Sequence, residues 1–334
     1  MRVIGAGEKV PRDFHGAVVA IGNFDGVHRG HQTLLKVARE IAAKEARPCG
    51  VLTFEPHPRT FFKPSEPVFR LTPEPLKARL IAALGASFTA VLAFDRELSS
   101  LEPEEFVARF LAGGFHASHV VTGYDFHFGR GRKGSPATMM ALGTHSGFGV
   151  DIVDQVTDEG DMHSPFSSSS IRQALRHGHV ASAAHELGYH WTIMGEVVKG
   201  DRRGRTIGFP TLNIVLEPGT EPYRGIYAVR VREADGGSTF WHGAGYFGDR
   251  PTFDTGRSFL EAHLIGFDGD LYGKTLFVEF IELIRPDRRF ASVAELTDQM
   301  AKDCLEAKAR LSRFETDDPL AAYPLGRLQQ EGRI

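Results

Sequence analysis

The chain has 334 residues, of which 42% are hydrophobic and 24% charged, and its formal net charge is -3. This length favours two domains, because single hydrophobic cores seldom grow beyond about 250–300 residues. The balanced charge argues against a general nucleic-acid-binding or membrane-surface protein, and there is neither a signal-peptide core nor an apolar run of about 18 residues.

Short apolar runs alternate with helical patterns from Ala17 to about Gly188. This alternation predicts an α/β domain, Rossmann-like, with a parallel sheet and helices on both faces. In such sheets ligands bind at the carboxyl ends of the strands. The expected strands are Ala17–Ile21, Gly50–Phe54, Thr89–Ala93, Val120–Gly123 and Val150–Val153, and the expected helices are His31–Glu45, Pro75–Leu84, Pro103–Leu111, Pro136–His145 and Ser169–His177.

The first strand leads through the turn GNFDG into VHRGH and an amphipathic helix. His28 and His31 therefore lie at a helix N-terminus, where N–H groups and a partial positive charge favour phosphate. Two imidazoles there can donate hydrogen bonds to a phosphate that is gaining negative charge. The competing interpretation is a capped helix with two solvent-facing histidines, because matches to HxGH alone are common.

HxGH after a first strand resembles the nucleotidylyltransferase superfamily, whose histidines hold the phosphates of ATP while a substrate phosphate attacks. The longer string GNFDGVHRGH resembles the adenylyltransferase half of bacterial bifunctional riboflavin kinase/FAD synthetases. This resemblance implies that ATP binds at the turn, with contacts from Gly22, Phe24, Asp25 and Gly26.

Two later loops carry further candidates. Asp125, Phe126 and Phe128 follow the fourth strand, and aromatic rings beside a carboxylate suit a flat polar ring such as a flavin. Packing of the phenylalanines on the sheet is the alternative. The basic stretch that follows, Arg130–Gly134, can meet phosphate, and His57 lies in a loop that two prolines predict to be stiff and extended.

Ser167, Ser168 and Ser169 precede an apolar helical run that contains Arg172. Serines in this position serve as helix caps, and with Arg172 one turn inside they also predict a phosphate site. The family usually has S-S-T-x-I-R here, so Ser169 stands in place of threonine, and we expect function to be retained with slightly looser packing. The motif argues against an aminoacyl-tRNA synthetase, which would pair its histidines with a lysine-rich loop.

The hydrophobic period changes after a short predicted helix at residues 179–188, where Gly188-Tyr189-His190 replaces the family's usual Gly-Arg-Pro linker. Alternating residues from Trp191 onward predict a small antiparallel β-barrel. We expect domains at 1–186 and 187–315 and a loosely held polar tail at 316–334. The expected strands are Trp191–Val198, Gly225–Arg232, Ser238–Gly243, Phe259–Ile265 and Thr275–Leu283, followed by a helix from a capping box at Ser292 to about Phe314.

The string KGDRRGRTIGFPTLN begins the chemistry of this second half. Its lysine and glycines, Lys199, Gly200, Gly204 and Gly208, favour a phosphate-binding arch, although a solvated hairpin tip is the alternative and the ending of a Walker A loop is missing. Thr211 and Asn213 are two residues apart on an extended chain, so both side chains face one side. Their hydroxyl and amide oxygens suit Mg²⁺ shared with ATP phosphates.

Glu261 and His263 alternate with apolar residues and so share one face of a strand. A carboxylate near the metal can take a proton from an attacking hydroxyl, whereas a solvent-facing strand pair is the alternative. Together with GRTIGFPTLN this pattern resembles riboflavin kinase, in which the threonine and asparagine hold the metal and the glutamate is the base. The string GDRPTF is also family-like, but Gly245-Tyr246-Phe247 before it departs from the usual run on the flavin side.

The resemblance implies a bifunctional enzyme that phosphorylates riboflavin to FMN with ATP and Mg²⁺, and then transfers AMP from ATP to FMN, giving FAD and pyrophosphate. Two alternatives compete with this interpretation: a transferase of the same superfamily acting on a cytidylyl or pantetheine-phosphate substrate, and a non-enzymatic flavin sensor. The first alternative predicts no kinase half, so the riboflavin-kinase motif argues against it. The second is expected to lack at least one catalytic residue, but this chain has all five: His28, His31, Thr211, Asn213 and Glu261.

The expected partners are the small molecules riboflavin, FMN and ATP. Neither nucleic acid nor a membrane is expected, and a weak homo-oligomer is left open. Cys49 and Cys304 are the two cysteines, and no CxxC occurs. A reduced cytosol therefore fits this chain and a zinc site does not.

Overall fold

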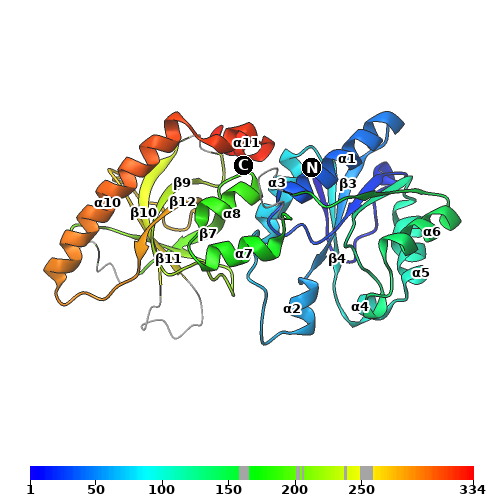
Figure 1. Ribbon diagram of the computed structural model, residues 1–334, viewed down its shortest axis with the longest axis horizontal. Helices are drawn as coiled ribbons and strands as arrows, with labels where there is room; N and C mark the ends of the chain where they lie inside the picture. The colour runs from blue at the N-terminus through cyan, green and yellow to red at the C-terminus, as the bar shows by residue number, and fades with distance from the viewer. Residues whose placement is uncertain (158–164, 201–203, 205–206, 237–238, 249–258) are drawn as a thin grey trace. The chain divides into compact units, whose positions relative to one another are not determined.

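The computed structural model describes residues 1–157, 165–200, 204, 207–236, 239–248 and 259–334. They form two compact units (Figure 1), of which the first comprises Met1–Val68 and Lys77–Phe166 and the second Phe69–Leu76 and Ser167–Ile334. The chain enters the second unit at Ser167, earlier than the domain boundary expected at residue 186. The helices between these positions belong with the barrel, since Tyr223 N donates to the carbonyl of Leu175 at 2.8 Å.

The first unit contains a six-stranded sheet in the order β1-β4-β3-β2-β5-β6, and every neighbouring pair is parallel. β2 is central and all four of its residues are buried. The chain order reverses there, because β3 lies on one side of β2 and β5 on the other, and ligands bind at such a switch point. The strands are β1 Arg2–Ile4, β2 Val18–Ile21, β3 Cys49–Glu55, β4 Phe88–Ala93, β5 His119–Gly123 and β6 Gly149–Val153.

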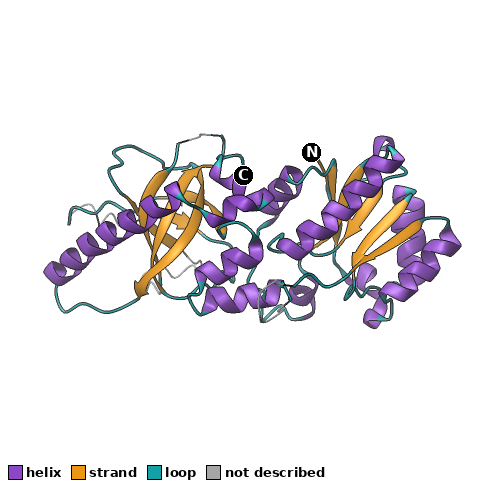
Figure 2. Ribbon diagram, turned by 45° about the horizontal axis from the view of Figure 1, so that its top comes forward, coloured by secondary structure: helices purple, strands orange, loops and turns teal. Residues whose placement is uncertain are grey.

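The five expected strands of this sheet are therefore confirmed within a residue at each end. The edge strand β1 was missed because it has three residues, two of them exposed, and so carries no hydrophobic period. Helices flank the sheet (Figure 2), as expected. They are α1 Arg29–Glu45, α2 Pro58–Phe62, α3 Glu74–Ala83, α4 Arg96–Ser100, α5 Pro103–Phe106 with a π-helical continuation to Phe115, and α6 Pro136–Ser146.

The stretch after β3 corrects one expectation. The two prolines do not hold an extended loop throughout, since Pro58 begins α2, where its fixed φ suits the first helical position. His57 caps this helix, and its Nδ1 accepts a hydrogen bond from Arg59 N at 3.2 Å. The histidine therefore has a local structural role.

The second unit is built on a closed barrel of antiparallel strands in the order β10-β11-β8-β7-β12-β9. Helix α10 covers part of its outer surface, where Ala307 and Leu311 pack with Ala228 and Ile281. The elements are α7 Ser168–Arg176, α8 Val180–Leu187, β7 Thr192–Val198, β8 Leu212–Val215, β9 Gly225–Glu233, β10 Trp241–Phe247, β11 Phe259–Leu264, β12 Thr275–Pro286 and α10 Val293–Thr316.

The capping box of α10 is confirmed with one change of partner. Ser292 Oγ accepts from Glu295 N at 3.2 Å, and the Glu295 carboxylate accepts from Ala291 N at 3.0 Å. The strand expected at Ser238–Gly243 is found at Trp241–Phe247, and Ser238 lies outside the described residues.

The expectation of a loosely held tail is wrong. The chain after α10 forms a 3₁₀ turn at Pro319–Ala322 and helix α11 at Pro324–Gln330, with Leu320, Leu325 and Ile334 buried. These apolar residues are too few and too irregularly spaced to give a helical period, so the sequence reads as polar.

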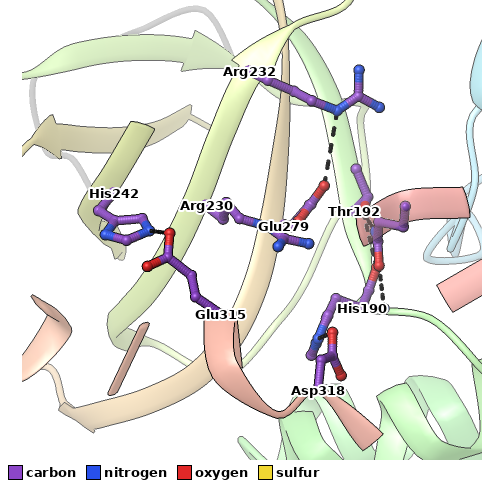
Figure 3. A network of polar contacts seen from close by, with 9 residues as sticks. His190, Thr192, Arg230, Arg232, His242, Glu279, Glu315 and Asp318 are labelled. Atoms are coloured by element: carbon purple, nitrogen blue, oxygen red, sulfur yellow. Dashed lines mark hydrogen bonds and ion pairs between the residues drawn. The ribbon is translucent and has the colours of Figure 1, made fainter. Parts of the chain in front are cut away.

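Buried hydrogen bonds join this C-terminal segment to the start of the barrel (Figure 3). His190 Nε2 lies 2.9 Å from Asp318 Oδ2, and Gln329 Nε2 donates to Thr192 Oγ1 at 2.8 Å. Gln329 also pairs with both main-chain groups of His190, at 2.8 and 3.0 Å. The residue that departs from the family's linker is therefore matched by partners in the last turns of the chain.

The same segment lies next to a buried row of charges on the outer face of the barrel. Arg230, Glu279 and Thr192 are directly opposite one another across β9, β12 and β7, so their side chains share a face. Arg230 Nε donates to Glu279 at 2.6 Å, and Arg232 Nε lies 3.9 Å from the same carboxylate. Burial raises the pKa of Glu279, and the two guanidiniums oppose that rise.

We predict that Asp318→Asn destabilises this unit in a pH-dependent way. Burial raises the pKa of Asp318, but the hydrogen bond and charge of His190 outweigh it and hold this pKa below its ordinary value. A carboxyl of this kind stabilises the fold above its unfolded pKa and loses that effect as the pH falls through its folded pKa. The free energy of unfolding should fall by about 2–4 kcal/mol at pH 7, and the difference should shrink below about pH 4.

Urea unfolding followed by tryptophan fluorescence measures this directly, since the two tryptophans, Trp191 and Trp241, both belong to the second unit. Asp317→Asn is the matched control, because Asp317 is exposed. An equal loss of stability at pH 7 and at pH 3 would contradict the ion-pair explanation.

Candidate functional site

The turn after β2 has an uncommon backbone. Phe24, Gly26 and Val27 have φ angles of 50, 86 and 39°, in the left-handed region that residues with a side chain disfavour. Each non-glycine residue there costs about 1–3 kcal/mol and persists only where its surroundings hold it. The side chains of Phe24 and Val27 are completely buried and so anchor the turn.

His28 and His31 are brought together at the start of α1. His28 is the N-cap residue, but its side chain does not cap the helix. Its ring stacks on that of His31 with 3.8 Å between centroids, and Phe24 lies 4.9 Å from His31. His28 is only 7% exposed, so the alternative of two solvent-facing histidines is wrong for this residue.

Gly30 has a clear steric role between the two histidines. A Cβ at this position would lie 3.1 Å from the His28 ring, closer than side chains normally pack. The glycine of HxGH therefore allows the first imidazole to fold over the helix start. The predicted juxtaposition of two imidazoles at a helix N-terminus is confirmed.

The three predicted flavin contacts in the loop after β5 differ in how far their side chains are exposed. Asp125 is exposed, Phe126 is half-buried, and Phe128 is 6% exposed within the hydrophobic core. The rings of Phe126 and Phe128 stack at 5.7 Å. The packing alternative therefore describes Phe128 and, in part, Phe126, which packs against the same core, and Asp125 is the most accessible of the three.

Sequence reasoning missed an aromatic cluster at the same edge of the sheet. Phe62 is 65% exposed, and its ring contacts Phe94 in an edge-to-face arrangement at 5.8 Å. Phe94 packs on Phe54, and Phe54 on Phe106, at 6.1 and 6.5 Å, and Phe106 reaches Phe128 at 5.6 Å. The one signal in the sequence was the Phe61-Phe62 pair after the two prolines, which gives no indication of its partners.

The basic stretch of this loop is paired within the protein. Arg130 and Lys133 both contact the carboxylate of Glu102, the lysine at 3.2 Å. The hydrogen bond from Lys133 lowers the pKa of Glu102. These two cations are thus partly neutralised, which weakens the expectation that they bind phosphate.

The serine motif belongs to the second unit. Ser167 caps α7, with its Oγ accepting from Ser170 N at 3.1 Å, so the capping interpretation is confirmed. Ser169 is exposed, and a methyl group there would bury little surface. Ser168 stands in the first turn of the helix beside it.

Arg172 is 8% exposed, and its Nε donates to the carbonyl of Phe69 at 2.6 Å. Any phosphate contact would therefore come from its terminal Nη atoms. His28 and His31 lie in the other compact unit, so a shared phosphate site for the two clusters stays a prediction.

The glycine arch of the barrel unit lies close to β8. A Cβ on Gly200 would come within 2.3 Å of the Asn213 amide, and one on Gly204 within 2.2 Å of the Phe209 carbonyl. Gly208 has a φ of 85°. Lys199 and these glycines are described, whereas residues 201–203 and 205–206 of the arch lie outside the described part.

Asn213, Glu261 and Tyr246 form a row across three strands. Glu261 pairs directly with Asn213 of β8 and with Tyr246 of β10, so the three side chains share a face. Leu260, Ala262 and Leu264 are buried, whereas Phe259, Glu261 and His263 are half-buried on the opposite face of β11, as the alternation predicted. Thr211 Oγ1 lies 3.5 Å from Glu261 Oε2.

His263 and Tyr246 make contacts beside this row. His263 Nδ1 lies 2.8 Å from the carbonyl of Pro210, and Tyr246 donates to Asp287 at 3.1 Å. The departure from the family at Tyr246 therefore adjoins Glu261. Asp249–Phe253 of the GDRPTF string lie outside the described residues.

The oxygen donors of this patch fit a magnesium ion. Asn213 is 5% exposed, and its Oδ1 has no hydrogen-bond partner among the residues that the structure describes. A buried acceptor of this kind is costly unless a ligand satisfies it. In the described part of the chain no three His, Cys, Asp or Glu side chains are grouped to hold a metal, so Mg²⁺ here would rely on neutral oxygens and substrate phosphates.

Within the described ranges, no helix combines the length and the apolar character needed to cross a membrane.

The comparisons with known proteins agree on both halves of the chain. Residues 10–168 match the family model of FAD synthetase, and residues 187–311 match that of riboflavin kinase. The bifunctional riboflavin kinase/FMN adenylyltransferase of Escherichia coli K12 is 38% identical over 293 residues, which cover 88% of this chain and 92% of that protein. The Bacillus subtilis protein of the same name is 36% identical over 296 residues, covering 87% and 91%.

A solved structure resembles this fold over nearly its whole length. It is a Streptococcus pneumoniae chain described as a macrolide-efflux protein, with a TM-score of 0.80 and 31% identity, covering 92% of this chain and 99% of that one. With both family models and both curated relatives in agreement, the chain belongs to the bifunctional riboflavin kinase/FMN adenylyltransferase family and carries both activities.

Proposed function

We propose that riboflavin phosphorylation takes place at the patch of Thr211, Asn213 and Glu261, and adenylyl transfer to FMN at the turn that carries His28 and His31. The observation that supports the kinase assignment best is the register of β8 and β11. It sets Glu261 opposite Asn213, with the Thr211 hydroxyl 3.5 Å from the carboxylate. A base beside hard oxygen ligands is the arrangement that phosphoryl transfer to an alcohol needs.

In the kinase reaction the oxygen of the ribityl 5′-hydroxyl attacks the γ-phosphorus of ATP, and ADP leaves. Glu261 accepts the proton of that hydroxyl. Thr211 and Asn213 would hold Mg²⁺, which supplies charge neutralisation on the phosphates when bound. Lys199, Gly200, Gly204 and Gly208 form the arch that we assign to the phosphates. The close approach of Gly200 to Asn213 supports this assignment, because a Cβ there would push the arch away from β8. A Cβ on Gly204 would collide with the Phe209 carbonyl of the same arch.

The adenylyl transfer needs no general base, because the phosphate of FMN is already an anionic nucleophile. It attacks the α-phosphorus of ATP, and pyrophosphate leaves. His28 and His31 donate hydrogen bonds to phosphate oxygens as charge develops on them. The turn of Gly22, Phe24, Asp25 and Gly26 adds main-chain donors, and Ser167, Ser168, Ser169 and Arg172 stay predicted phosphate contacts.

For the flavin of this second reaction we propose a platform made by Phe126 and Asp125, with Phe128 supporting it from the core. Exposed Phe62, joined to Phe128 through a continuous series of ring contacts, extends this aromatic surface. Flat rings bind well on such surfaces because stacking buries large apolar faces.

We infer a reducing compartment such as the cytoplasm for this enzyme. Cys49 and Cys304 are both free, and burial raises the pKa of each thiol to about 11. Thiols of this kind are protonated at neutral pH and react slowly.

His31→Ala should abolish FAD formation, by about 10²–10³-fold or more, while FMN still accumulates from riboflavin. The reason is that the ring serves adenylyl transfer in this proposal and has no part in riboflavin phosphorylation. Incubation with riboflavin, ATP and Mg²⁺, followed by chromatography of the flavins, measures both products in one sample. His145→Ala, far along the chain on α6 and exposed, serves as the control.

Glu261→Ala should have the converse effect. Riboflavin phosphorylation should fall by about 10²–10⁴-fold because the attacking hydroxyl loses its base. FAD formation from supplied FMN should remain. Loss of both activities in folded protein from either substitution would overturn the assignment of separate sites.

Asn213→Ala should raise the Mg²⁺ concentration that gives half-maximal kinase activity by about 10-fold or more, since one oxygen ligand is lost. Titration of riboflavin phosphorylation with MgCl₂ measures the shift, and the Mg²⁺ dependence of FAD formation from FMN in the same preparation is the control. An unchanged titration would remove Asn213 from the metal site.

A further inference from the structure

Lys77 is a buried cation with oxygen partners at the edge of the sheet. Its side chain is 1% exposed, and Nζ donates to Glu55 Oε1 at 2.8 Å. The same ammonium lies 3.4 Å from Thr53 Oγ1 and 3.5 Å from the main-chain carbonyl of Asn23. Lysine is seldom buried this completely unless its charge is paired, so the position is a costly one that needs an explanation.

These oxygens come from one strand, β3, and from the turn between β2 and α1. Thr53 and Glu55 lie at the carboxyl end of β3, two residues apart and therefore on one face. β3 pairs with β2, and Asn23 follows β2 by two residues. Thr53 Oγ1 also donates to the Asn23 carbonyl at 3.1 Å. Lys77 and Thr53 thus both bind the same main-chain oxygen.

That oxygen stands directly before the left-handed backbone of the turn. Phe24, Gly26 and Val27 have positive φ angles, and His28 follows at once as the N-cap of α1. A turn in this conformation keeps its shape only where contacts fix it on both sides. The buried side chains of Phe24 and Val27 fix it from within, and the hydrogen bonds of Lys77 and Thr53 fix the carbonyl at which it begins.

We propose that Lys77 is a positioning residue for adenylyl transfer. Together with Thr53 it clamps the Asn23 carbonyl, and through that carbonyl it holds the turn that presents His28 and His31. It acts without touching a substrate. An apolar residue of similar size would often serve stability equally well, whereas only a donor can fix a carbonyl in direction as well as in place. The proposal rests on the assignment of His28 and His31 to the ATP phosphates.

The test is Lys77→Met in the full-length enzyme, which removes the donor and keeps most of the volume. The kcat of FAD formation from FMN should fall by about 10–100-fold, because small displacements of catalytic groups cost this much, and the KM for ATP should change by less than about 3-fold. Riboflavin phosphorylation by the same molecules should stay within about 2-fold, since its proposed residues lie in the second unit. Circular dichroism of the variant checks that the first unit is folded.

Two further substitutions sharpen the result. Lys36→Met is the matched control, since Lys36 lies on α1 with a 73% exposed side chain and pairs only weakly with Glu40 at 3.9 Å. Thr53→Val keeps the shape of the side chain but removes its hydroxyl, whereas Thr53→Ser keeps the hydroxyl. The valine should lower kcat by about 3–10-fold and the serine, which keeps the hydroxyl, should restore it. If Lys77→Met does not fold, this threonine pair decides the question.

An unchanged kcat in Lys77→Met, or equal activities of Thr53→Val and Thr53→Ser, would overturn the clamp. A parallel fall of kinase activity would show a general loss of folded protein, and the threonine pair would then decide between support and refutation. His31→Ala distinguishes failure of the Lys77 clamp from failure of the assignment of His28 and His31 to the ATP phosphates. If His31→Ala abolishes FAD formation and Lys77→Met does not affect it, only the clamp is wrong, whereas an active His31→Ala enzyme would refute the underlying assignment.

Discussion

Phosphate recognition by main-chain groups requires backbone that comes closer to its neighbours, or turns more sharply, than most residues allow. At the turn that we propose as the ATP site of the first unit, this constraint appears as the left-handed angles of Phe24, Gly26 and Val27. In the second it appears as Gly200 and Gly204, where a Cβ would come within 2.3 and 2.2 Å of other atoms. The rest of each unit supplies the contacts that hold these segments in an unfavourable backbone conformation.

The two units meet that need in different ways. In the parallel sheet the turn lies at the switch point next to β2, so neighbouring strand ends can reach it, and buried Lys77 with Thr53 binds its first carbonyl. In the barrel the arch lies against the outer face of β8, and the antiparallel register brings Asn213, Glu261 and Tyr246 into one row. Direct pairing across strands therefore builds the patch that we propose for the kinase, whereas packing at strand ends builds the turn that we propose for adenylyl transfer.

The C-terminal segment shows how a departure from a family pattern is accommodated. His190 stands where the family usually has the last residue of a Gly-Arg-Pro linker, and a buried imidazole needs partners. Asp318 lies 2.9 Å from Nε2 of this imidazole, and Gln329 pairs with the main-chain N–H and carbonyl of His190 at 2.8 and 3.0 Å. The family model of the kinase half ends at residue 311, before both of these partners. The last turns of the chain thus complete the second unit beyond the part that the family model covers.

Local patterns were enough for most elements and for the chemistry of the motifs. Alternating apolar runs predicted the strands near β2 and β11, and the string GNFDGVHRGH placed His28 and His31 at a helix start, because glycine content, capping and hydrophobic period are properties of adjacent residues. The signal failed where segments are short or depend on distant partners. These segments are β1, the helix begun by Pro58, and the tail after Thr316, whose few apolar residues are buried only once the second unit has folded.

The sequence by itself determined which residues have suitable chemistry: two histidines after a strand, a threonine and an asparagine two apart, a glutamate on an alternating strand. Only the tertiary structure decided which of them meet and what holds them. Strand register set Glu261 opposite Asn213, and folding brought Thr53 and Lys77, the latter paired with Glu55, to the carbonyl of Asn23. Contacts of this kind join residues far apart in the chain, and their directions follow from packing and pairing rather than from any local preference.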